Sequence, residues 1–221
     1  MMPFPGGIED TSNAALILSA AAALLTLYLA SLPASLVRSL VKTLAVALLA
    51  VLAFVQQAPL LLVGALALSA AGDAFLSRPG DRAFLAGLAS FLAAHLLYIA
   101  LFALSGGGVD ALMSFRAALA AAMLLGVLLI ATRLLPRLEA GLKLPVALYI
   151  VAILAMGLAA LTLNSPAVIA GAILFIISDG ILAWEKFLLT AGSPVSKSMR
   201  HTVWITYYAA QLLITLGFLL G

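Results

Sequence analysis

The sequence predicts an all-α polytopic membrane protein, a bundle of eight transmembrane helices in a single transmembrane domain covering residues 1–221. Hydrophobic residues make up 66% of the chain and charged residues 9%, whereas about 25% of the residues in a soluble domain are charged. The mean hydropathy is +1.27. This composition excludes a water-soluble globular domain. The absence of cysteine excludes a disulfide framework and thiol chemistry.

Apolar runs of about 20 residues, the length that crosses a bilayer, recur along the chain. The first follows Glu9 and Asp10 without a preceding basic residue, which is atypical of a cleaved signal peptide, so we expect a true span. Prolines at or beside the connections, among them Pro59, Pro79 and Pro166, separate later runs. The expected spans are residues 13–31, 38–55, 59–77, 83–104, 112–132, 144–163, 166–187 and 202–220.

The basic residues predict the orientation in the membrane. Four alternate connections hold all of the lysines and arginines except Arg116, and cytoplasmic connections are the ones rich in such residues. We therefore expect both termini outside the cytoplasm, in the inner membrane if the cell is bacterial. Because the net charge of +3 lies in these short loops, it indicates membrane orientation, and we expect no nucleic-acid partner.

Polar residues inside the spans indicate a site. At about 1.5 Å of rise per residue, Asp73, Tyr149, Asp179, Tyr207 and Tyr208 all lie about 8–12 Å from the expected cytoplasmic boundary. Ionisable residues within spans are usually functional. The alternative interpretation is that each of these polar side chains only makes hydrogen bonds that hold helices together. The motifs "GDAFL" and "SDGIL" around the two aspartates are consistent with a four-plus-four internal repeat.

A second polar group lies deeper, because His95, Tyr98 and Gln211 are nearer the middle of their spans. His95 and Tyr98 are three residues apart and share a helix face. With two histidines and no cysteine in the chain, we expect neither a metal site nor a cofactor. Lys42 is predicted to be an anchor whose ammonium group reaches the membrane surface.

Four ordered motifs carry a family resemblance: Gly72-Asp73, His95-x-x-Tyr98, "LFIISDGILAWEKF" and "YYAAQLLI". Together they resemble the YhhN/TMEM86 family of integral membrane lysoplasmalogenases, which cleave the vinyl ether bond of lysoplasmalogens. The resemblance implies that Asp73 and Asp179 occupy the two membrane-embedded acidic positions of that family. The residues expected to bind substrate or support the site are His95, Tyr98, Tyr149, Ser178, Lys186, Tyr207, Tyr208 and Gln211.

Three functions remain open from the sequence. An intramembrane hydrolase would use paired aspartates as acid and base on a lysophospholipid that enters from the bilayer, releasing a fatty aldehyde and glycerophospho-ethanolamine or -choline. A proton-coupled transporter of small molecules or lipids would also bury aspartate and histidine. A non-catalytic lipid-binding protein gives no reason for two acids at matched depth.

The charge asymmetry makes a topological prediction. A reporter fused after Gly221 should read periplasmic or extracellular, because the basic connections favour the cytoplasm. Paired reporters, one active only inside and one only outside the cytoplasm, measure this. A cytoplasmic signal at Gly221 would mean an odd number of spans or reversed insertion.

Overall fold

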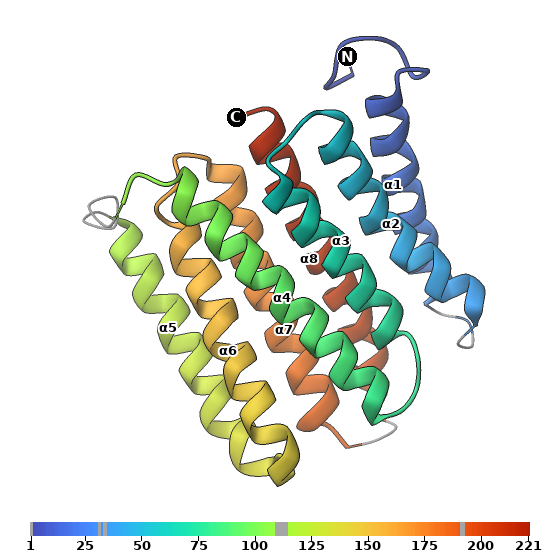
Figure 1. The fold of residues 1–221 in the computed structure, drawn as a ribbon. Coiled ribbons are helices and arrows are strands. Elements are labelled where there is room, and N and C mark those ends of the chain that lie inside the picture. Colours follow the sequence, from blue (N-terminus) through green and yellow to red (C-terminus); the bar gives the residue numbers. More distant parts are fainter. Residues whose placement is uncertain (1, 31, 33–34, 109–114, 191–192) are drawn as a thin grey trace. The chain divides into compact units, whose positions relative to one another are not determined.

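The computed structural model describes residues 2–30, 32, 35–108, 115–190 and 193–221, and its regular secondary structure there is entirely helical (Figure 1). A short 3₁₀ helix, Leu135–Arg137, links α5 to α6. The α-helices are α1 Thr11–Leu29, α2 Leu36–Val55, α3 Leu60–Leu76, α4 Asp81–Ser105, α5 Phe115–Leu134, α6 Ala140–Ala160, α7 Pro166–Phe187 and α8 Pro194–Leu219.

Length and composition confirm the membrane character of this fold. Within the described residues, seven helices are long and apolar enough to cross a membrane. The remaining α-helix, α3, is apolar but has 17 residues, about the lower limit for a span. The predicted all-α membrane fold is thus confirmed. The single transmembrane domain and the internal repeat stay predictions.

Most helices begin and end near the expected positions, and α7 has the predicted bounds. The expected end of the first span at residue 31 and the expected start of the fifth at 112 lie outside the described residues. The last helix begins before the expected span of 202–220, because α8 starts at Pro194. Its first turns expose Lys197 and Arg200. Hydropathy marks where the membrane begins, whereas the helix continues into water.

Two helix starts show how local sequence sets the boundaries. The carboxylate of Asp10 accepts hydrogen bonds from the backbone N–H groups of Ser12, at 2.9 Å, and Asn13, which caps α1. Pro145 lies inside α6, close to the start of the helix. A proline is tolerated so close to the helix start because it removes only one hydrogen bond, to the carbonyl of the exposed Gly141.

The chain divides into two compact units. The first comprises Met1–Leu97 and Phe218–Leu220, and therefore holds α1, α2, α3 and the first part of α4. Here α1 packs on α2 and α2 on α3, as Figure 1 shows. The Ser90 hydroxyl of α4 donates a hydrogen bond to the Leu68 carbonyl of α3, at 2.7 Å. Hydroxyl groups thus join neighbouring helices where water is absent.

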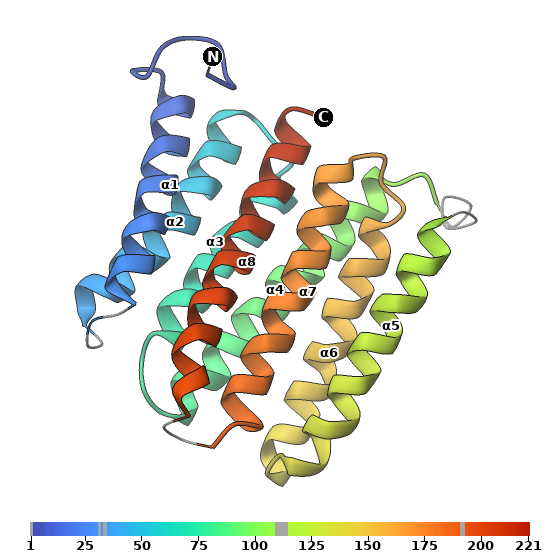
Figure 2. The same ribbon diagram turned by 180° about the vertical axis from the view of Figure 1, so that it is seen from behind.

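The second unit comprises Tyr98–Gly217 and Gly221. In it α5, α6 and α7 pack on one another, as the reverse view in Figure 2 shows. α7 and α8 approach closely at Gly171, where a Cβ atom would lie 2.9 Å from the Ala210 carbonyl oxygen. Small residues allow helix backbones to come this close in membranes. A larger side chain at Gly171 would therefore push α8 away.

Gly171 supplies a stability test. Gly171→Ala should lower the thermal unfolding temperature in detergent, because the new methyl group meets backbone atoms and overpacking typically costs about 1–3 kcal/mol. Gly126→Ala on α5 is the matched control, since a Cβ there meets nothing within 4 Å. Equal unfolding temperatures for the two variants would contradict the close contact of α7 with α8.

Candidate functional site

Asp73 is the most deeply buried acidic side chain among the described residues, with 1% of its surface exposed. It lies on α3, where its Oδ1 atom is 2.8 Å from the Nζ atom of Lys42 on α2. The expectation that Lys42 reaches the membrane surface is therefore wrong. Opposite charges attract more strongly in a low-dielectric environment than in water, which favours the pairing of this ammonium group with the carboxylate.

The turn between α2 and α3 brings these two residues together. Gln57 adopts a left-handed conformation with φ of 54°, and Pro59 precedes the first residue of α3. The two helices pack along each other in opposite directions. Lys42, near the start of α2, therefore lies level with Asp73, near the end of α3.

His95 is fully buried on α4 in the same unit. Its Nδ1 atom is 2.7 Å from the Phe91 carbonyl oxygen. A carbonyl only accepts hydrogen bonds, so Nδ1 carries a proton. Phe91 packs over Gly72, where a Cβ atom would lie 2.6 Å from the ring. The Gly72-Asp73 motif thus combines a close helix contact with a buried acid.

Asp179 lies on α7 in the second unit and is half-buried. The hydroxyl group of Tyr149 on α6 donates a hydrogen bond to its Oδ2 atom. This contact agrees with the common depth expected for the two residues from the sequence. The phenol fixes the orientation of the carboxyl group, so both oxygens of Asp179 have defined positions.

Tyr98 and Gln211 form a buried polar pair between α4 and α8 in the second unit. The Tyr98 hydroxyl donates to the Gln211 Oε1 atom at 2.5 Å, and both side chains are fully buried. Phe175 packs edge-on against Tyr98 and Tyr207, with ring centroids 6.5 and 5.4 Å apart. The Gln211 Nε2 atom has no hydrogen-bond partner among the described residues. It could therefore donate to a bound oxygen atom.

Three other predicted supporting residues contact groups on α7 or α8. The Ser178 hydroxyl donates to the Val203 carbonyl at 3.0 Å, which ties α7 to α8. Tyr208 stacks on Trp204 with ring centroids 6.0 Å apart. Lys186 is exposed, and its Nζ atom lies 5.7 Å from the Phe187 ring centroid.

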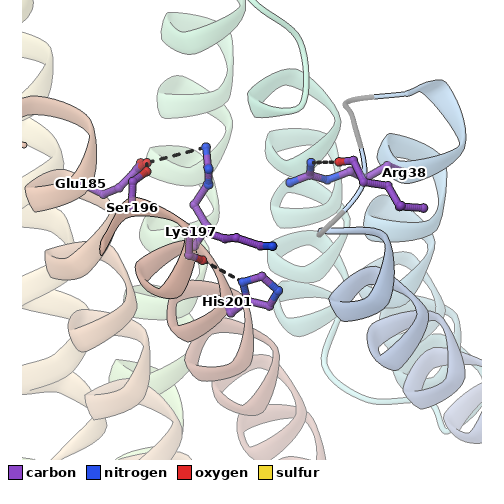
Figure 3. Close-up of polar contacts among 7 residues, drawn as sticks. Arg38, Glu185, Ser196, Lys197 and His201 are labelled. Atoms are coloured by element: carbon purple, nitrogen blue, oxygen red, sulfur yellow. Dashed lines mark hydrogen bonds and ion pairs between the residues drawn. The ribbon is translucent and has the colours of Figure 1, made fainter. Parts of the chain in front are cut away.

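Charged side chains gather where α7 ends and α8 begins (Figure 3). The Glu185 carboxylate accepts a hydrogen bond from Ser196 and lies 4.0 Å from Arg200. The His201 ring lies 2.8 Å from the Lys197 carbonyl oxygen. In the first unit, Arg38 donates to the Leu32 carbonyl. These contacts order the predicted cytoplasmic ends of the helices.

The contacts determine what the site offers chemically. In the first unit they join Lys42 to Asp73, and in the second they join Tyr149 to Asp179 and Tyr98 to Gln211. No three histidine, aspartate or glutamate side chains in the described ranges lie together in a way that could hold a metal ion. Oriented carboxyl groups in apolar surroundings suit proton transfer. The sequence did not identify Lys42 as a site residue. Its position inside an expected span, at about the depth of Asp73, could have indicated this role.

Comparisons with known proteins give a consistent result. The model of the YhhN family matches residues 37–218. The chain is 41% identical to lysoplasmalogenase TMEM86B of Rattus norvegicus over 157 residues, which are 71% of this chain and 60% of the relative. It is 39% identical to the Homo sapiens protein of the same name over 71% of this chain and 62% of that relative.

A bacterial relative is similar as well. The lysoplasmalogenase of Mycobacterium tuberculosis (strain CDC 1551 / Oshkosh) is 36% identical over 72% of this chain and 60% of its own length. The chain thus spans about 60% of the length of the curated relatives that it matches. No solved structure matches the chain significantly.

The Tyr98–Gln211 pair makes a stability prediction. Tyr98→Phe removes the donor to a fully buried amide oxygen, which should cost about 1–3 kcal/mol. Thermal unfolding in detergent measures the loss. Tyr28→Phe is the control, because Tyr28 is 69% exposed. If both variants unfold at the wild-type temperature, the hydrogen bond does not stabilise the second unit.

Proposed function

The chain belongs to the YhhN family, and from this membership we propose that it is an intramembrane hydrolase that cleaves the vinyl ether bond of lysoplasmalogens. The observation that carries the proposal is a pair of acidic side chains, Asp73 and Asp179, inside apolar helices of such a chain. The relatives named lysoplasmalogenase support the choice of substrate.

The chemistry of the substrate explains why two carboxyl groups suffice. A carboxylic acid donates its proton to the alkene carbon remote from the ether oxygen, which produces an oxocarbenium ion. Water then adds to the carbon bonded to oxygen and loses a proton to a carboxylate, giving a hemiacetal. The hemiacetal breaks its bond to the glycerol oxygen as its hydroxyl group loses a proton and the glycerol oxygen gains one. The net reaction consumes one water molecule and releases a fatty aldehyde and glycerophospho-ethanolamine or -choline.

We assign Asp73 and Asp179 to the acid and carboxylate roles in this reaction. The Tyr149 hydroxyl, bonded to Asp179, would orient one of them. The Gln211 Nε2 atom, without a partner among the described residues, would donate a hydrogen bond to a substrate or water oxygen. His95 would help to orient water or the neighbouring acid.

The substrate has one alkenyl chain and a charged headgroup, so it can enter sideways from the bilayer. The alkenyl chain would remain among apolar helix faces. Its phosphate would lie near the exposed Arg78, Arg82, Lys197 or Arg200, since arginine binds phosphate through charged hydrogen bonds. Because the vinyl ether is bonded to the glycerol, it would lie only a few bonds from the phosphate, at the headgroup end of the alkenyl chain.

A proton-coupled transporter is the alternative function. Such proteins typically build their central site on helices interrupted within the membrane. Here α3 and α7, which carry the two aspartates, are continuous from Leu60 to Leu76 and from Pro166 to Phe187. Continuous helices favour a fixed reaction site. Uptake of unchanged lipid into proteoliposomes, without aldehyde release, would instead support transport.

Asparagine substitutions test the proposed mechanism. Asp73→Asn and Asp179→Asn keep the side-chain volume but remove proton exchange, so each should lower turnover by at least about 10²-fold, the usual contribution of a general acid or base. His95→Gln should have a smaller effect. The measurement is the release of aldehyde from a lysoplasmalogen by detergent-purified protein. Mass spectrometry quantifies the aldehyde.

Thermal unfolding of the same preparations is the control. Asp179→Asn should remain folded, because an amide replaces an acid that is costly to bury. Asp73→Asn also removes the ion-pair partner of Lys42, so its unfolding temperature should fall further, and its turnover is compared per amount of folded protein. Near-normal turnover in both would rule out the two-carboxylate mechanism. Activity that falls only in parallel with the amount of folded protein would show that the aspartates serve hydrogen bonding between helices.

A further inference from the structure

Glu185, in the last turn of α7, faces Ser196, in the first turn of α8, within the second unit (Figure 3). The Ser196 hydroxyl donates a hydrogen bond to the Oε1 atom of Glu185. The Nη1 atom of Arg200 lies 4.0 Å from the same oxygen. Because both contacts use Oε1, the Oε2 atom keeps its capacity to accept hydrogen bonds from a ligand.

The guanidinium group of Arg200 also keeps donors for a ligand. A separation of 4.0 Å from the carboxylate oxygen is longer than a hydrogen bond, which reaches about 3.2 Å. No other group among the described residues forms a printed-length hydrogen bond with this guanidinium, and the side chain is 55% exposed. An exposed ion pair of this kind contributes little to stability. The pair therefore offers a carboxylate and a guanidinium side by side, at a surface that a ligand can reach.

Opposite charges at this spacing match the headgroup of an ethanolamine lysophospholipid. A guanidinium group binds phosphate through charged hydrogen bonds, and a primary ammonium group has three N–H donors for a carboxylate. The ammonium group of choline has no N–H, and proteins bind it with aromatic rings. Trp184, the aromatic residue next to Glu185 in the chain, already has the Arg133 guanidinium 6.0 Å from its ring centroid. The chemistry of these side chains therefore favours ethanolamine over choline.

The pair also lies at a suitable distance from a proposed catalytic carboxyl group. Asp179 precedes Glu185 on the same continuous helix, and a rise of about 1.5 Å per residue separates them by about 9 Å along its axis. In the substrate, the glycerol and the phosphate stand between the vinyl ether and the ammonium group. That part of the lipid, when extended, is long enough to cover this separation.

We propose that Glu185 and Arg200 form the headgroup subsite of the hydrolase, in which Arg200 binds the phosphate and Glu185 binds the ammonium group of an ethanolamine headgroup. The inference rests on the proposed function for the identity of the lipid. Arg200 contacts a group that every lysophospholipid carries, so it provides affinity. Glu185 contacts a group that differs among headgroups, so it provides selectivity. Ser196 is a positioning residue that orients the Glu185 carboxylate.

Kinetics with two substrates test the separate roles. Glu185→Gln keeps the shape of the side chain and an acceptor for Ser196 but removes the charge. It should raise KM for an ethanolamine lysoplasmalogen by about 10-fold, with little change in kcat. KM for a lysoplasmalogen with a phosphoglycerol headgroup should stay unchanged, because that lipid has no ammonium group. Arg200→Met should raise KM for both lipids. An equal effect of Glu185→Gln on the two lipids, or normal KM values in Arg200→Met, would overturn the proposal.

Two exposed charges of the second unit provide matched controls. Glu139→Gln removes a carboxylate that makes no capping hydrogen bond at the start of α6, and Arg137→Met removes an exposed guanidinium group. Neither control should change KM for either lipid, and thermal unfolding shows whether all four variants are folded. A rise in KM in the controls as large as that in Glu185→Gln and Arg200→Met would mean that surface charge in general attracts the lipid, which contradicts a specific subsite.

Binding of a lipid that cannot be cleaved tests the subsite without using activity. The probe is an ethanolamine lysolipid with a saturated alkyl ether chain, which has no vinyl ether, and isothermal titration calorimetry in detergent measures its affinity. The wild type should bind it more tightly than the matching choline lysolipid, and Glu185→Gln should remove this preference. Equal affinities in the wild type, or a preference that persists in Glu185→Gln, would overturn the assignment.

Two further outcomes separate the possible sources of the headgroup and the two proposals. If diacyl phosphatidylethanolamine binds as tightly as the lysolipid, the pair holds a lipid of the bilayer, and the assignment to the substrate is wrong. If the lysolipid binds with the expected preference but the wild type releases no aldehyde from a lysoplasmalogen, the proposed reaction fails while the headgroup subsite holds.

Discussion

The low dielectric of the membrane interior is the constraint on which the structure depends. No water is available there to satisfy polar groups, so each polar side chain needs a partner within the protein. Lys42 pairs with Asp73, Tyr149 with Asp179, and Tyr98 with Gln211. Each pair joins two helices and fixes how they are rotated against one another. The groups that order the helices are therefore the same groups that can carry out chemistry.

Close packing between helices also holds them together. It is needed because lipid chains are as apolar as leucine, so burial of apolar side chains alone does not drive helices to associate. Gly72 lets the Phe91 ring lie against α3 beside Asp73, and Gly171 lets α8 approach the backbone of α7. Ser178 closes the latter contact with a hydrogen bond to the Val203 carbonyl. Rigid helices joined in this way hold carboxyl groups at fixed positions, which proton transfer requires.

The same low dielectric suits the proposed reaction. An oxocarbenium ion is a positive charge, and its attraction to a fixed carboxylate is stronger in apolar surroundings than in water. The lipid also brings its apolar chain to the site without leaving the bilayer. Acid and carboxylate roles are hard to distinguish by residue type, since both are aspartates. The neighbouring side chains differ, since Lys42 contacts Asp73 and Tyr149 contacts Asp179.

The sequence by itself determined the helices, because the length of an apolar run and the residues that cap it are local properties. It also predicts a common depth for Asp73, Asp179 and Tyr149, since the rise along a helix is constant. Only the tertiary structure decided that Lys42 turns towards Asp73 and that Tyr98 bonds to Gln211. These pairings depend on how each helix is rotated about its axis. Helices that are apolar on all sides carry no sequence signal for that rotation.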